Sequence, residues 1–238
     1  MPQWKVEEHN HFEADTLLTA LVNELTLLFK DRYYFSIFTP DTDVVIIACT
    51  YLSLHPGICI DVCLMTSKGT RILSVPQFVE GLGCNTRALL GAYVLTGCDH
   101  IGSFAGISKA RCFQEFLNIT EAPIIEALSS LGNSERLEHE SIENITKFVM
   151  ILYCSKRKED MVRSSTMKSI GDLRVFFYSK YQHEGDQLPP TQNALNFKIK
   201  RANYVCMMWK RNMNNLTFQV PPISHEHGWD KENGKLSL

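Results

Sequence analysis

Strand-forming segments occupy the first 75 residues of the chain, and helical segments follow them. Three early segments are rich in apolar or β-branched residues, at 33–38, 57–65 and 71–75. The turn at 68–70 joins the last two, which predicts a β-hairpin. The run 44–49 is apolar throughout, so its pattern fits a buried strand or a short helix equally well. This order of elements predicts an α/β fold with a helical region after the sheet.

Helical periodicity is clear in most of the remaining chain. Apolar residues recur at helical spacing in 13–29, where they predict one buried face. Asn85 or Thr86 would serve as the N-cap of a helix that runs to residue 97. The segment 155–169 is polar and predicts an exposed loop. Further helices are expected at 75–83, 108–118, 121–132, 140–154 and 188–213.

Charge and cysteine usage narrow the class of protein. The formal net charge is -2, so any surface for nucleic acid has to be a local basic patch. No cysteine pair has the C-x-x-C spacing of a zinc site, which predicts reduced, buried thiols. No apolar stretch reaches the roughly 20 residues of a membrane span, and 2–15 show no signal peptide. We therefore expect a nuclear or cytoplasmic protein with no membrane partner.

Five acidic residues lie at the predicted ends of buried elements. Glu13 and Asp15 open the first helix, Asp41 and Asp43 follow a strand, and Asp99 follows a helix and a glycine. Carboxylates two residues apart project the same way only on extended backbone. Because the residue before Pro40 is kept extended, we expect an extended loop at Asp41 and Asp43. Carboxylate oxygens with water and phosphate are the ligands that Mg²⁺ prefers. The set predicts a divalent-metal site, with paired ions able to assist phosphodiester cleavage.

Each of these acids also has a structural explanation. Asp15 is a good N-cap, where a negative charge is favourable without any function. Asp41 and Asp43 are common turn residues, and Asp99 lies in a glycine-rich loop. The joint pattern is more specific than any one member.

The loop after Asp99 has a second pattern, suited to an anion. Gly102 and Gly106 allow the backbone to turn tightly and present its N–H groups. Lys109 and Arg111 lie at the start of the following helix, where cations and amides together favour a phosphodiester. With Ser108, these residues form the predicted nucleic-acid-binding set. The alternative is a glycine-rich loop with solvated basic residues.

The helix expected near the C-terminus carries both apolar and basic residues. Leu195, Ile199, Cys206 and Trp209 share one face, which favours core packing over stacking on bases. His225 and His227 in the tail are a weaker candidate metal pair. The basic residues form the best local patch in the chain: Lys198, Lys200, Arg201, Lys210 and Arg211.

The segment LTGCDHIGSFAGISKARCFQEF, at 95–116, resembles the flap endonucleases and related structure-specific nucleases. In those enzymes Gly-x-Asp precedes a glycine-rich helix-two-turn-helix, and two acidic pairs come earlier in the chain. The motifs EADT, DTDV, LTGCD, LPPT, RANY…W and HGW together resemble a set of animal proteins of mobile-element origin that carry this domain. The resemblance covers about residues 13–229.

The resemblance implies a fold, a reaction and a set of site residues. The fold would be a truncated PIN-like sheet core followed by a helix-two-turn-helix and a C-terminal helical region. The implied segments are 1–100 (partial nuclease core), 101–154 (helix-two-turn-helix and following helices), 155–214 (helical region) and 215–238 (irregular tail). Metal ligation by Mg²⁺ or Mn²⁺ would fall to Glu13, Asp15, Asp41, Asp43 and Asp99, with Asp41, Asp43 and Asp99 catalytic. Lys109 would hold the substrate backbone.

Two departures from the family limit the expected activity. Only twelve residues precede Glu13, too few for the opening strand, helix and second strand of those nucleases. Ser108 also stands where they have a glycine. One hypothesis is therefore a divalent-metal nuclease acting on DNA or RNA, weak or inactive as an isolated chain, with a second polypeptide completing the sheet. The alternative is an inactive nucleic-acid-binding or protein-interaction module of the same descent.

Overall fold

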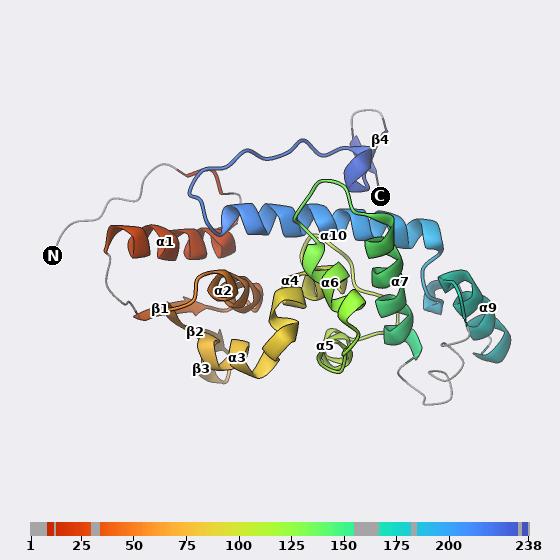
Figure 1. Cartoon of the computed structure of the whole chain (residues 1–238), viewed down its shortest axis with the longest axis horizontal. Coiled ribbons are helices and arrows are strands. Elements are labelled where there is room, and N and C mark those ends of the chain that lie inside the picture. Colours follow the sequence, from red (N-terminus) through yellow and green to blue (C-terminus); the bar gives the residue numbers. More distant parts are fainter. Residues whose placement is uncertain are drawn as a thin grey trace. The chain divides into compact units, whose positions relative to one another are not determined.

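The computed structural model has an α/β fold, with a small mixed sheet and many helices (Figure 1). It describes residues 9–11, 13–29, 34–154, 167–181, 185–232 and 235–237, so most of the predicted loop 155–169 lies outside the described residues. Contacts divide the chain into two compact units. Unit 1 comprises residues 1–87 and 208–221, and unit 2 comprises residues 88–207 and 222–238.

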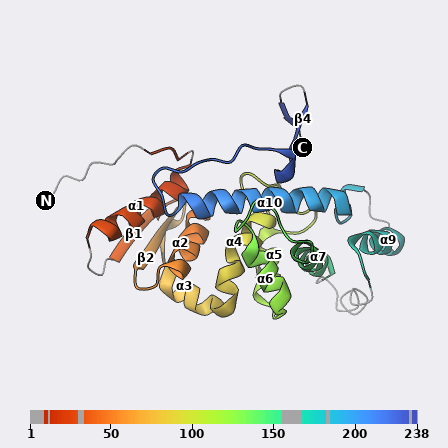
Figure 2. The same cartoon turned by 45° about the horizontal axis from the view of Figure 1, so that its top comes forward.

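Unit 1 holds the three-stranded sheet, in the order β1-β2-β3. β1 and β2 are parallel, with Phe38 opposite Cys63, and β2 and β3 form the predicted antiparallel hairpin. α2 and α3 pack against the strands (Figure 2). The elements are α1 (Ala14–Leu28), β1 (Tyr34–Thr39), α2 (Asp43–Leu54), β2 (Cys59–Thr66), β3 (Gly69–Ser74), α3 (Val75–Leu82) and the 3-10 turn η1 (Gly83–Ala88).

The apolar run 44–49 forms the first half of helix α2. Every residue from Asp43 to Leu52 is buried, which explains why the run shows no amphipathic period. Since β1 and β2 are parallel, the chain must cross from the end of one strand to the start of the other. α2 makes that crossing. The topology thus decides between strand and helix where the local pattern could not.

Helix α1 forms as predicted, but the face that it buries differs from the predicted apolar face. The buried residues are Thr16, Thr19, Ala20 and Val22, whereas Leu28 is exposed. The hydroxyl of Thr19 donates to the carbonyl oxygen of Thr16 at 2.9 Å. Because helical threonines can satisfy their hydroxyls on the preceding turn, they can be buried at little cost.

Unit 2 is mainly helical. α6 contacts α7 and α4, and α5 contacts α7. α10 supplies residues to both units, and its Leu195, Ile199, Cys206 and Trp209 are buried as expected for core packing. The elements are α4 (Leu89–Leu95), α5 (Lys109–Leu117), α6 (Ala122–Ser130), α7 (His139–Cys154), α9 (Ile170–Tyr181), η2 (Gly185–Gln187), α10 (Gln192–Asn212), η3 (His225–His227), β4 (Asp230–Glu232) and β5 (Lys235–Ser237).

Two local expectations need correction. Asn85 and Thr86 lie inside η1 and are not N-caps; the hydroxyl of Thr86 donates to the carbonyl oxygen of Gly83 at 2.9 Å. The tail after residue 215 is not wholly irregular, since β4 and β5 pair antiparallel.

The remaining sequence expectations concern thiols and membranes. Five of the cysteines are buried, but Cys59 and Cys84 are exposed. In the described part of the chain, no helix has the length and apolar character needed to cross a membrane.

Candidate nucleic-acid interface

The loop between α4 and α5 is held in place by apolar side chains at every third residue. Ile101, Phe104 and Ile107 are buried, whereas the glycines between them, Gly102 and Gly106, are exposed. Three buried side chains therefore hold the loop in place, and its two glycines lie exposed between them.

Asp99 lies at the tip of a tight turn that starts this loop. The N–H of Cys98 donates to the oxygen of Ile101 at 2.9 Å, and the N–H of Ile101 returns the bond at 3.0 Å. Gly97 enters the turn with φ +124°, and a Cβ there would lie 3.0 Å from the Cα of Ser103. A side chain at Gly97 would therefore be both strained and crowded. Asp99 itself is exposed.

Ser108 and Lys109 both have roles within the loop. The Ser108 hydroxyl accepts the N–H of Arg111 at 3.3 Å and so caps α5. The Lys109 ammonium donates to the carbonyl oxygens of Tyr93, at 2.5 Å, and Gly97, and lies 3.5 Å from the centre of the Tyr93 ring. Its positive charge thus stabilises the C-terminal end of α4. A phosphate would compete with these carbonyls for Lys109.

Lys198 of α10 reaches the same loop from a distant part of the sequence. Its ammonium donates to the carbonyl oxygen of Gly102 and lies 4.5 Å from the centre of the Phe104 ring. Burial lowers the pKa of Lys198 to about 8, and the neighbouring cations Lys109 and Arg201 add to this effect. An anion placed beside Lys198 would offset both effects, because a nearby negative charge favours the charged form of the lysine.

Arg201 follows Lys198 by three residues on the same face of α10. Its Nε donates to the carbonyl oxygen of Gly228 at 2.8 Å, and its guanidinium lies 5.9 Å from the Trp229 ring. Both cations line a cavity of about 400 Å³ whose opposite wall is the loop at 100–105. Among the described residues that line it, none is a carboxylate. The cavity is therefore suited to an anion.

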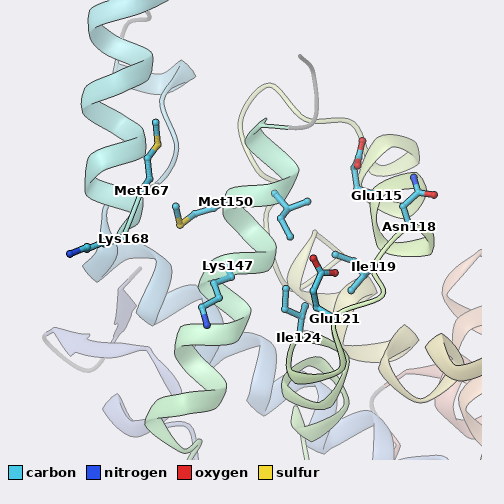
Figure 3. A pocket seen from close by; sticks show the side chains of 10 residues that line it. Glu115, Asn118, Ile119, Glu121, Ile124, Lys147, Met150, Met167 and Lys168 are labelled. Carbon is cyan, nitrogen blue, oxygen red and sulfur yellow. The ribbon is translucent and has the colours of Figure 1, made fainter. Parts of the chain in front are cut away.

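A second cavity, of about 630 Å³, has a mixed charge (Figure 3). Lys147 and Met150 lie on α7, between Met167 on one side and Glu115 and Glu121 on the other (Figure 3). The two carboxylates would repel a polyanion at close range. The first cavity is therefore the better candidate for nucleic acid.

The predicted acids are divided between the two units. Glu13 precedes α1 in extended conformation, with φ -123° and ψ 140°, and Asp15 lies in the first turn, as the spacing argument required. The stretch after Pro40 is not extended, because Thr42 is helical with φ -78° and ψ -20°. Asp41 accepts the N–H of Asp43 at 2.8 Å in a turn just before α2, whose N-cap is Thr42.

Oxygen donors of this kind suit Mg²⁺ or Mn²⁺. Among the residues that the structure describes, however, no three His, Cys, Asp or Glu side chains gather to hold a metal ion. The same holds for His225 and His227. Nδ1 of His227 and the Ser224 hydroxyl share a hydrogen bond of 3.1 Å. Glu13, Asp15, Asp41 and Asp43 of unit 1 thus form no such group among the described residues, and the predicted Mg²⁺ or Mn²⁺ site stays a prediction.

Comparison of the chain with protein-family models, with curated proteins and with solved structures gave no match. The nuclease resemblance therefore stays a prediction. Sequence reasoning had identified the glycine loop and the basic patch of α10 separately. Their meeting, through the hydrogen bond from Lys198 to the carbonyl oxygen of Gly102, is the feature that sequence reasoning missed.

Proposed function

We propose that the chain binds the phosphodiester backbone of DNA or RNA at the cavity between the glycine loop and α10. In this proposal Lys198 and Arg201 neutralise a phosphate, and the backbone N–H groups beside Gly102 and Ser103 donate to its oxygens. The observation that carries the proposal is the pair of cations facing an exposed glycine backbone across a cavity without lining carboxylates.

The electrostatics of the cavity supports an anionic ligand over a neutral one. A lysine whose pKa is lowered by burial holds its proton at a cost. A phosphate beside it restores the ordinary preference for the charged form, and charge-assisted hydrogen bonds add to the binding free energy. Since contacts to phosphate carry no base information, we expect little sequence preference.

Fluorescence anisotropy with labelled single-stranded and branched DNA, and with RNA, tests this proposal. Lys198→Gln and Arg201→Gln are each expected to weaken binding about ten-fold, as loss of a charged hydrogen bond costs roughly 1.5 kcal/mol. Lys200→Gln is the matched control, because it removes the same charge from the same helix outside the cavity. Equal affinity of all three variants and wild type would refute the proposal.

Divalent-metal-dependent phosphodiester hydrolysis is the second candidate function. The observation that favours it is the pair Asp41 and Asp43, which stands where β1 ends and α2 begins. Under this candidate the chain would act on DNA or RNA with Mg²⁺ or Mn²⁺, weakly as an isolated chain. The binding function does not depend on it.

A further inference from the structure

In the described part of unit 1, one face of the sheet carries exposed side chains that the helices do not cover. Ile37, Ile60 and Val62 point to one side and are buried, on the side where α2 and α3 contact the strands. Because side chains alternate along a strand, their neighbours point to the other side. There the strand register places Phe38, Cys63 and Ile72 in one row across the three strands.

This open face, defined by Tyr34, Phe38, Cys63, Met65 and Ile72, is strongly apolar and exposed. The exposed fractions are 65% for Tyr34, 63% for Phe38, 45% for Met65 and 71% for Ile72. Cys63 is buried between its two neighbours in the row. Parallel strands such as β1 and β2 normally have both faces covered. An uncovered apolar face on such a pair is thus a sign of an interaction surface.

The β1 edge carries no charge, and the open face carries a single one among the described strand residues. β1 reads YFSIFT, with no charged residue and no proline, although such residues usually protect an edge strand from pairing. Among the strand side chains that the structure describes on the open face, only Asp61 carries a charge, and the Tyr34 hydroxyl donates to it. The row of Phe38, Cys63 and Ile72 carries no charge, so it can pack on an identical row without repulsion.

The area of the face is large enough for a dimer. Aromatic side chains bury about 150–250 Å² each, so these exposed fractions leave roughly 450 Å² uncovered on one copy. Two copies would bury roughly 900 Å² from these side chains alone, and the strand residues around them bring the total past the roughly 1,000 Å² expected of a specific interface.

We infer that the open face is a homodimer interface, at which a second copy of this chain packs its own Phe38 and Ile72. A symmetric dimer places the same patch on both copies, which an uncharged apolar row satisfies. The inference is independent of nucleic-acid binding, so Lys198→Gln is expected to dimerise as wild type does.

Sedimentation equilibrium of the full chain tests the inference. Wild type is expected to be dimeric in the micromolar range, and Phe38→Lys and Ile72→Lys are each expected to raise the dimer dissociation constant at least ten-fold. Val175→Lys is the matched control, since Val175 is 67% exposed on α9 of unit 2. Circular dichroism verifies that each variant is folded. A wild type that stays monomeric up to ~100 µM would overturn the inference and leave the face to another polypeptide.

Cysteine alkylation gives a second readout that needs no substitution in the face. Cys59 is exposed and points to the open face, opposite Tyr34, whereas Cys84 is exposed in η1. As the protein concentration rises through the dimer range, alkylation of Cys59 is expected to slow while that of Cys84 stays constant. Dimer formation without protection of Cys59 would show that another surface mediates it.

Discussion

Lys198 carries a charge that its surroundings disfavour. The ammonium is held by the carbonyl oxygen of Gly102 and the Phe104 ring, yet burial and nearby cations lower its pKa to about 8. A group in this state is sensitive both to pH and to an anion. Two predictions follow from that sensitivity, one for binding and one for stability.

The affinity for nucleic acid should fall with rising pH. Lys198 is protonated below pH about 8 in the free protein and loses its charge above it. Anisotropy titrations from pH 7 to pH 9 are therefore expected to show a loss of affinity that Lys198→Arg, with its permanent charge, does not show. The same pH dependence in wild type and Lys198→Arg would contradict the role of Lys198.

Replacing Lys198 by methionine should stabilise the fold at neutral pH. Between pH about 8 and the ordinary pKa of 10.5, the unfolded chain binds the proton that the folded chain has lost. The contribution of this group to stability thus rises with pH. Lys198→Met is expected to raise the free energy of unfolding by about 1 kcal/mol at pH 7, after the lost Gly102 hydrogen bond is set against the relieved burial.

Urea unfolding at pH 7 and pH 10 measures this difference. The advantage of Lys198→Met over wild type should shrink at pH 10, where the wild-type lysine is neutral in the folded state. A variant that is less stable than wild type at both pH values would mean that the lysine is structural.

At the scale of elements, α10 organises the turn after α6. The amide oxygen of Asn203 accepts the N–H of Gly132 at 2.7 Å, and its amide nitrogen donates to the carbonyl oxygen of Ser134 at 2.8 Å. Gly132 has φ +84°, and a Cβ there would lie 2.6 Å from the backbone of Cys206 and Met207. The turn can therefore approach α10 only because residue 132 has no side chain.

Gly132→Ala is expected to lower the free energy of unfolding by about 3 kcal/mol, because it combines positive φ with a backbone clash. Urea denaturation measures the change. Gly81→Ala is the control: Gly81 lies in α3 with nothing within 4 Å of an added Cβ, so alanine should stabilise the helix slightly. Equal stability of the two variants would contradict the close approach at Gly132.

The elements that the sequence predicted well are those with a local period. The hairpin of β2 and β3, the strand β1 and the core face of α10 all follow from spacing alone. The apolar run in α2 has no period, so its secondary structure could not be assigned from the pattern. The threonines of α1 are polar residues, so their burial could not be predicted from the pattern either. The contact of Lys198 with Gly102 joins residues 96 apart in the chain, and no local signal encodes it.

For the whole molecule, the division into two units bears on the second candidate function. Glu13, Asp15, Asp41 and Asp43 belong to unit 1, and Asp99 belongs to unit 2. Asp41 also has a structural role, because its side chain accepts the N–H of Asp43 where α2 begins. Any test of hydrolysis must therefore separate the charge of these residues from their contribution to the fold.

Asparagine at residues 41 and 43 makes that separation. The amide oxygen of Asn can accept the same N–H bond that Asp41 accepts, so Asp41→Asn with Asp43→Asn should keep the fold while removing two negative charges. If the chain hydrolyses DNA or RNA, cleavage with Mn²⁺ should fall at least a hundred-fold in this variant. Gel assays on branched and single-stranded substrates measure it. Wild-type chain that cleaves no faster than the variant would end the hydrolysis candidate.

The salt dependence of binding tests the central claim most directly. Each phosphate contact that is lost lowers the slope of log affinity against log salt by about 0.9 for duplex DNA and about 0.7 for a single strand. The combined Lys198→Gln, Arg201→Gln variant loses two contacts and is therefore expected to show a slope smaller than that of wild type by about 1.4 to 1.8, with Lys200→Gln unchanged. Equal slopes for wild type and the combined variant would contradict a phosphate site at the glycine loop.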